Sequence, residues 1–181
     1  MARPSWDVYF MGVVDSISTR STCDRGKPAC VIVNKNNQIL ASGYAGSPPG
    51  LPHCDAVGHK FEETRYVITA DKELTQDQAE LIEHEKMQKD LMSNIWVGPT
   101  SIHCVRTIHA EINAINQAAK CGHPIDGSTF YVSFTPCYRC AMSLISVGCR
   151  RVVCKKRYAN AGTESEEAFK KVGIELVYLE K

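Results

Sequence analysis

The sequence predicts an α/β protein in which helices cover both faces of a five-stranded mixed sheet. Apolar strands at residues 29–33 and 38–44 flank an asparagine-rich turn at 34–37, which is typical of an antiparallel hairpin. In the last third of the chain strands alternate with helices, which predicts crossover connections and parallel pairing. The chain has 181 residues and is 44% hydrophobic, enough for one core. We therefore expect a single domain, residues 1–181.

The predicted elements of the first half begin with an amphipathic helix at residues 6–18. Its apolar side chains recur at helical spacing and should face the core: Val8, Met11, Val14 and Ile17. After the hairpin, a glycine- and proline-rich run to residue 52 predicts a loop. Residues from about 61 to 101 form an insertion, with a short strand at 66–69 and a charged, helix-prone stretch at 71–94.

The second half begins with a predicted buried helix near His109. Helical spacing relates Ile108, Ile112, Ile115 and Ala119, and a glycine at 122 ends the run. The remaining predictions are a strand at 129–133, a helix from 137 to a glycine at 148, a strand at 151–154, a helix at 164–172 and a strand at 174–179.

Metal-binding side chains lie at the starts of two of these helices. His109 begins one helix, and Cys137 and Cys140 share the first turn of the other, which follows Pro136. A catalytic zinc site uses three such ligands and leaves its fourth position for water. A helix N-terminus also favours the negative charge of thiolates. The spacing therefore predicts that both helix starts meet at one zinc ion.

Glu111, two residues after His109, is well placed to move protons beside that metal. Zinc lowers the pKa of its bound water from about 16 to about 7, and Glu111 could deliver that proton to a ring nitrogen and the leaving ammonia. The whole pattern, His-x-Glu and then Pro-Cys-x-x-Cys, is the signature of zinc-dependent nucleobase deaminases. Two other readings of Cys-x-x-Cys remain open. A structural zinc site would want a fourth protein ligand, and a redox pair would not require His109 or Pro136.

Several segments add a second pattern. They are Ser-Thr-Cys at 21–23, Gly-Tyr-Ala-Gly-Ser-Pro at 43–48, Gly-Leu-Pro-His-Cys-Asp at 50–55, residues 103–111, Thr-Pro-Cys at 135–137, and Tyr158. With these segments the chain resembles the deoxycytidylate (dCMP) deaminases of the cytidine deaminase superfamily. The resemblance implies the three-layer α/β/α cytidine deaminase-like fold and zinc-dependent hydrolysis of dCMP to dUMP for thymidylate synthesis. It also implies that His109, Cys137 and Cys140 bind zinc and that Glu111 shuttles the proton.

The nucleotide substrate has three candidate contacts. Tyr44 and Tyr158 could border the base, and Gly46 lets the backbone approach a ligand. The family usually has asparagine where this chain has Ala45, in a motif that takes part in nucleotide binding and in control by dCTP and dTTP. These two nucleotides are candidate effectors, and Ala45 puts their control in question.

A second, structural zinc site is a further candidate. Cysteines and histidines gather around the loops before the His109 helix: Cys23, His53, Cys54, His59, His103 and Cys104. Some relatives carry such a site, and the matching positions favour Cys23, His53 and His103, with His59 and Cys104 in reserve. The alternative is a set of buried thiols and loop histidines.

Composition narrows the function further. A net charge of +1 argues against nucleic-acid binding, and no stretch is apolar enough to span a membrane. Nine cysteines without a secretion signal favour reduced thiols and metal ligands, so we expect a cytoplasmic protein. By resemblance we expect a homo-oligomer. The alternatives are a deaminase of modified dCMP, of dCTP or of another base, and a non-catalytic zinc- and nucleotide-binding protein.

Overall fold

The chain divides into two compact units, one formed by Met1–Gly58 with Arg106–Lys181 and the other by His59–Val105. The computed structural model describes residues 3–64, 67–69, 95–97, 101–157 and 162–180. The elements of the first unit are α1 (Trp6–Ser18), β1 (Ala29–Val33), β2 (Ile39–Tyr44), α2 (Cys54–Val57), α4 (Ala110–Cys121), β7 (Thr129–Phe134), α5 (Tyr138–Ser146), β8 (Arg151–Lys156), α6 (Gly162–Val172) and β9 (Glu175–Tyr178).

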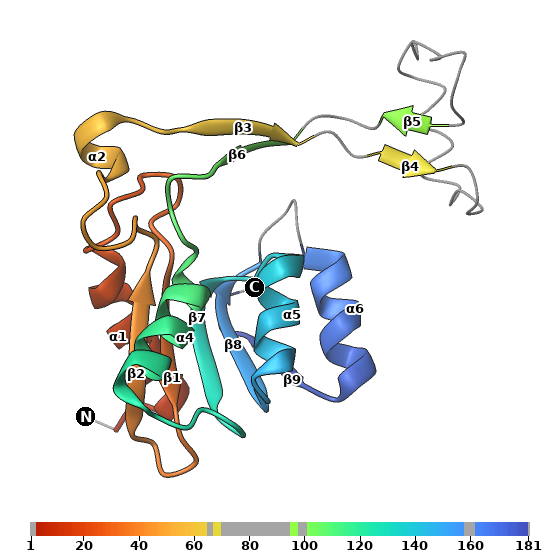
Figure 1. Cartoon of the computed structure of the whole chain (residues 1–181). Helices are drawn as coiled ribbons and strands as arrows, with labels where there is room; N and C mark the ends of the chain where they lie inside the picture. Colours follow the sequence, from red (N-terminus) through yellow and green to blue (C-terminus); the bar gives the residue numbers. More distant parts are fainter. Residues whose placement is uncertain (1–2, 65–66, 70–94, 98–100, 158–161, 181) are drawn as a thin grey trace. The chain divides into compact units, whose positions relative to one another are not determined.

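A five-stranded sheet in the order β2-β1-β7-β8-β9 forms the centre of the first unit (Figure 1). Strand β1 pairs antiparallel with both β2 and β7, whereas β7, β8 and β9 pair in parallel. The side chain of Asn34 fixes the β1–β2 turn by accepting hydrogen bonds from the backbone N–H groups of Asn36 and Gln38. The predicted mixed sheet is confirmed.

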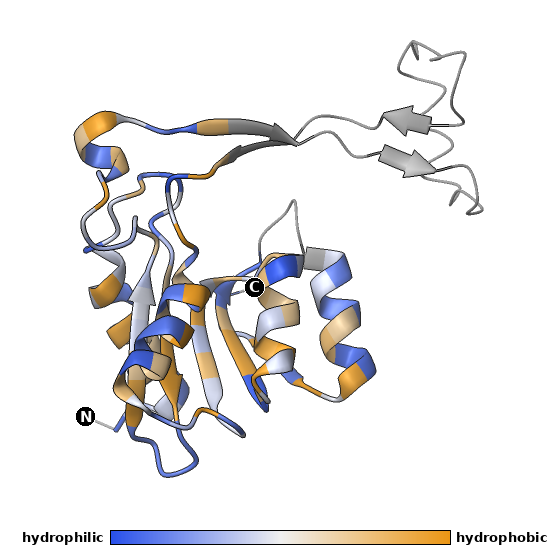
Figure 2. Cartoon of the chain, in the orientation of Figure 1, coloured by the Kyte–Doolittle hydropathy of each residue, from blue (hydrophilic) through white to orange (hydrophobic). Residues whose placement is uncertain are grey.

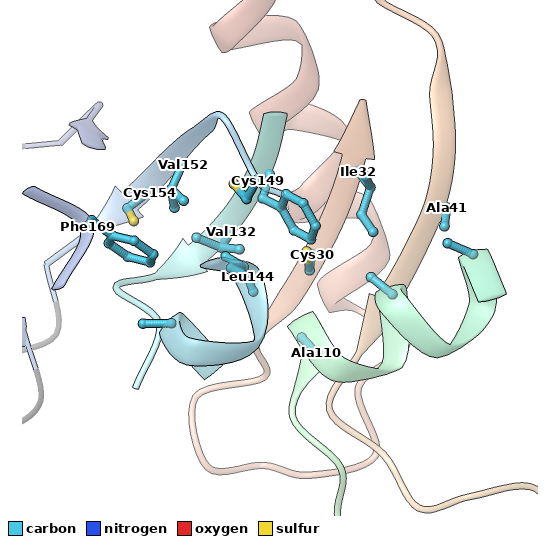
Figure 3. Packing of buried hydrophobic residues seen from close by; sticks show 14 residues of the cluster. Cys30, Ile32, Ala41, Ala110, Val132, Leu144, Cys149, Val152, Cys154 and Phe169 are labelled. Atoms are coloured by element: carbon cyan, nitrogen blue, oxygen red, sulfur yellow. The ribbon is translucent and has the colours of Figure 1, made fainter. Parts of the chain in front are cut away.

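Helices bury both faces of this sheet, in three layers. Alternate residues of β1, such as Val31 and Val33, pack with the α1 residues Phe10 and Val14. The other face packs against α4, α5 and α6 through a cluster seen in Figure 3, and apolar colour gathers on the strands between the helices in Figure 2. Both faces of β1 are therefore apolar, as expected for a central strand. The predicted inward position of Val8 is wrong: it is 56% exposed, and Phe10 is buried instead.

Helix α4 lies against β2 through small residues. Its buried alanines are Ala110, Ala114 and Ala118, which recur every four residues. The predicted buried face was shifted: Ile112 and Ile115 are half-buried and Ala119 is exposed. Gly43 explains the alanine face, since a Cβ there would overlap backbone atoms of Ala110 and Ala114. The helix backbone thus lies almost directly on the strand.

The second unit contains two antiparallel strand pairs. They are β3 (Phe61–Thr64) with β6 (Ser101–Cys104), and β4 (Val67–Thr69) with β5 (Ile95–Val97). The short strand predicted at 66–69 corresponds to β4, while β3, β5, β6 and α2 were not predicted. The helix-prone stretch 71–94 lies outside the described residues. No helix in the described part of the chain is both long and apolar enough to cross a membrane.

Candidate metal centre and active site

The predicted metal-binding residues lie where two helices begin, beyond the carboxyl end of β7. His109 is the N-cap residue of α4, and Cys137 is the N-cap residue of α5, with Cys140 in the first turn. Neither helix start has a side-chain hydrogen bond that caps it. Both helix N-termini therefore direct partial positive charge toward the same place, which favours thiolates.

The three side chains fit a tetrahedral zinc ion. The Nδ1 atom of His109 lies 3.5 Å from Cys137 Sγ and 3.4 Å from Cys140 Sγ. Ordinary Zn–N and Zn–S bond lengths at a tetrahedral angle require about 3.6 Å between such atoms. All three ligand atoms lie within 4.8 Å of one another, so the distances and the donor set both suit zinc. Cys140 is buried and His109 exposed, so the centre is open to solvent on one side.

The two thiols share their protons unequally. A hydrogen bond from Cys140, followed by one with His109, lowers the pKa of Cys137 to about 4. The same bond and burial raise the pKa of Cys140, and the bond with Cys137 raises that of His109. The lowered pKa favours the thiolate form of Cys137, which is the form that binds metal.

Glu111 is the buried carboxyl group of this centre. It is 7% exposed in the first turn of α4, and the sequence placed it there correctly. Burial raises the pKa of Glu111, which the neighbouring His109 partly offsets. A raised pKa makes a carboxyl group hold a proton more readily than an exposed one, which suits a group that accepts and returns protons.

The approach to His109 is held by the segment after β2. Gly46 and Ile108 exchange two backbone hydrogen bonds, of 3.3 and 3.0 Å. Ser47 Oγ donates to the carbonyl oxygens of Pro52 and Arg106. The side-chain amide of Asn113, which was not predicted to belong to the site, donates to the Tyr44 carbonyl oxygen in this region. Its one sequence signal is a short amide four residues after His109.

A second polar network reaches Thr135, close to the start of α5. Glu166 accepts two hydrogen bonds from Arg157 and one, of 2.7 Å, from Tyr178. The Tyr178 hydroxyl also lies 3.1 Å from Thr135 Oγ1, two residues before Cys137. Burial, with the hydrogen bond to Glu166, raises the pKa of Tyr178 to about 12. Its Thr135–Tyr178 contact spans 43 positions of sequence, and the network was not predicted.

The predicted substrate residues have different surroundings. The side chain of Tyr44 packs with the core cluster of α1, on the sheet face opposite α4. Gly46 contacts the segment before His109 through its backbone. Tyr158 lies outside the described residues.

The predicted second zinc ligands are only partly brought together. Cys23 and Cys54 are buried, and their sulfur atoms lie within 4.8 Å of each other. His53 instead uses its Nδ1 for a 3.1 Å contact with Thr22 Oγ1. His103 lies in β6, where its backbone pairs with Glu62 of β3. His59 and Cys104 belong to the second unit.

A surface hollow lies at the end of the sheet opposite His109, and its lining residues are of other types. Its lining includes Trp6, Asp7 and Arg151, near the starts of β7 and β8. Asp7 accepts hydrogen bonds from Arg151 and from Tyr131, so its charge is already compensated. Nothing in this hollow resembles a metal or nucleophilic centre, so it offers no alternative to the candidate site at His109.

A His-Cys-Cys trio beside a buried glutamate, on an α/β/α sheet, defines a zinc-dependent nucleobase deaminase. The family model for the cytidine and deoxycytidylate deaminase zinc-binding region matches residues 4–156. The chain belongs to this family.

Named relatives agree with the family assignment. ComE operon protein 2 of Bacillus subtilis is 31% identical over 180 residues, covering 99% of this chain and 74% of the relative. Deoxycytidylate deaminase of Mycobacterium phage D29 is 30% identical over 156 residues, covering 86% of this chain and 98% of the relative. A crystal structure of the dCMP deaminase of cyanophage S-TIM5, in complex with dCMP and dUMP, has a TM-score of 0.65 and 24% identity, covering 99% and 100% of the two chains. That structural likeness supports the shared fold.

Proposed function

We propose that this enzyme hydrolyses dCMP to dUMP and ammonia. The observation that carries the proposal is the buried carboxyl group of Glu111 beside the trio of His109, Cys137 and Cys140. The loop segments that resemble dCMP deaminases, and relatives named deoxycytidylate deaminase, support dCMP as the substrate.

The residues divide the work of this reaction. His109, Cys137 and Cys140 hold the zinc ion, which lowers the pKa of water when bound. One water supplies two protons and the new O4 oxygen. Glu111 accepts the first proton and delivers it to N3 of cytosine, then accepts the second and delivers it to the amino group, which leaves C4 as ammonia. The open side of the centre, next to His109, admits the base.

The test is ultraviolet-monitored deamination of dCMP, CMP, deoxycytidine and dCTP by the zinc-loaded protein. Selective loss of dCMP is the expected result. Equal turnover of deoxycytidine would show that the enzyme does not recognise the phosphate of dCMP. No turnover of any of the four, with zinc bound, would contradict the proposal and direct attention to modified nucleotides, other bases or a binding role.

A second, structural zinc ion belongs to the same proposal. The paired thiols of Cys23 and Cys54 support it, since two buried thiols this close can bind a soft metal. Metal analysis should find more than one equivalent of zinc per chain, and Cys54→Ala should remove only the excess. An unchanged zinc content in this variant would rule out Cys54 as a ligand.

Regulation and assembly remain predictions. Both backbone polar groups of Ala45 are hydrogen-bonded within the protein. Its N–H donates to the carbonyl of Pro28, and its carbonyl accepts from the N–H of Thr22 and the hydroxyl of Ser21. We expect weak responses to dCTP and dTTP, which the same assay measures when either is added to dCMP. Light scattering of the purified protein tests the expected homo-oligomer.

A further inference from the structure

Asn113 connects the start of helix α4 to the segment that follows β2. Its Nδ2 atom lies 2.8 Å from the carbonyl oxygen of Tyr44, and 3.4 Å from those of Gly46 and Ile108. Three acceptors around one nitrogen admit only the donor end of the amide, because the side-chain oxygen would repel them. The contacts span 67 and 69 positions of sequence to Gly46 and Tyr44.

The backbone connects these acceptors to the metal centre. Ile108 immediately precedes His109, and its carbonyl also accepts a hydrogen bond from Gly46. The backbone N–H of Asn113 donates to His109 at 3.0 Å and closes the first helical turn. Asn113 thus bonds to Ile108, which precedes His109, to the backbone of His109 itself, and to Tyr44 at the end of β2.

Packing reinforces this attachment. Gly43 lies so near the helix that a Cβ would overlap the backbone of Ala110 and Ala114. The Gly43 contact fixes how closely α4 approaches β2, while the Asn113 amide opposes sliding of the helix along the strand. A helix start held in both respects has little freedom to misplace His109 and Glu111.

We propose that Asn113 is a positioning residue of the active site, which sets the placement of His109 and Glu111 through the Tyr44–Gly46 backbone. Its side-chain amide donates to three backbone carbonyl oxygens and so acts on the site through the backbone. Outer residues that orient ligands typically affect metal affinity or activity by about 10- to 100-fold. The kinetic part of the proposal rests on the proposed deaminase function, but the metal-binding part does not.

The chain supplies a matched control at the other end of the same helix. His123 Nδ1 contacts the carbonyl oxygen of Leu40 at 2.6 Å and so connects the end of α4 to the same strand. Helix α4 has 12 residues and is about 18 Å long, so His123 is remote from the metal. A loss that is merely structural should appear in both variants.

The experiment compares Asn113→Ala, Asn113→Asp and His123→Ala by zinc affinity, the absorption spectrum of the cobalt-substituted protein, kcat and KM. We expect Asn113→Ala to lose about 10- to 100-fold in kcat or zinc affinity, with a changed cobalt spectrum and nearly unchanged KM. Asn113→Asp should lose more, because its carboxylate faces three carbonyl oxygens. His123→Ala should lower the melting temperature alone.

Two results would overturn the proposal. One is an Asn113→Ala protein with the zinc affinity, cobalt spectrum and kcat of His123→Ala. The other is failure of Asn113→Ala to fold while His123→Ala folds, which would show that the amide serves the stability of the whole helix. If the wild type turns over none of the nucleotides, the proposed function fails, and zinc affinity with the cobalt spectrum still decides the role of Asn113.

Discussion

The two ends of the central sheet both carry polar groups but differ in how these groups are paired. At the start of β8, Asp7 receives three hydrogen bonds of 2.7–3.0 Å from Arg151 and Tyr131, and Arg151 also pairs with Glu175. At the opposite end, Glu111 is buried among groups that bind metal, and burial raises its pKa. The pKa of Asp7 moves the other way, since its bonds with Arg151 lower it.

This difference separates a structural cluster from a reactive one. Where opposite charges satisfy each other, the folded state stabilises the ionised form of the carboxyl group. Where a carboxyl group is buried without a cationic side chain bonded to it, its ionised form is less favourable and it can exchange protons. Neutral substitution should therefore affect different quantities at the two carboxyl groups: activity at Glu111 and stability at Asp7.

Glu111→Gln should have the largest effect on activity. The amide keeps the shape but cannot carry the proton, so kcat should fall about 100- to 10,000-fold. Zinc content should be unchanged, and the zinc-free variant should be at least as stable as the wild type because a buried ionised group is removed. Steady-state kinetics, metal analysis and urea denaturation check these three expectations. A variant that retains kcat would show that Glu111 is not the proton shuttle.

Gly43→Ala should damage the site through packing. The new methyl group must displace α4, and overpacking of this kind costs about 1–3 kcal/mol. Because the displaced helix start carries His109 and Glu111, kcat should fall along with stability. Urea denaturation and kinetics measure both effects.

Gly12→Ala is the matched control for that change. Nothing lies within 4 Å of a Cβ at Gly12, in the middle of α1. Alanine there should stabilise the protein by about 0.5–1 kcal/mol and leave kcat unchanged. Equal losses in the two variants would contradict close packing of α4 on β2 as the cause.

The sequence predicts most of the first unit because its signals are local. The helix predicted at 6–18 and the strand at 29–33 have the bounds found in the structure. Hydrophobic periodicity and the asparagine-rich turn act over a few residues, so they can be read directly. The same is true of His109, Glu111, Cys137 and Cys140, whose spacing places each at a helix start.

Other features depend on what lies across the fold. The choice of alanines over isoleucines as the buried face of α4 follows from Gly43, a residue of another element. Asn113 and Tyr44 are 69 positions apart, and Asp7 and Arg151 are 144 apart. Nothing local in the sequence signals such pairs, and short polar side chains have many alternative partners. The second thiol pair shows the same limit, since Cys54 was one of six candidates.

Asp7→Asn should lower stability and leave activity unchanged. The amide loses the charge that holds Arg151, whose side chain is 19% exposed, and about 1–2 kcal/mol of unfolding free energy should be lost. Urea denaturation at pH 7 and the dCMP assay measure the two quantities. A large loss of kcat in this variant would remove the distinction between the two ends of the sheet.

The loss of unfolding free energy in Asp7→Asn should depend on pH, which tests the ionised state of Asp7 directly. Hydrogen bonds from Arg151 lower the pKa of folded Asp7 below its ordinary value of 3.8. The ionised group therefore contributes its full stabilisation above that value, and the contribution is lost as pH falls toward the lower folded pKa. The stability difference between wild type and Asp7→Asn should be constant from about pH 7 to pH 5 and should shrink below about pH 4. A difference that grows on acidification would mean that Asp7 is stabilised in its protonated form, which the geometry of the Arg151 pair does not allow.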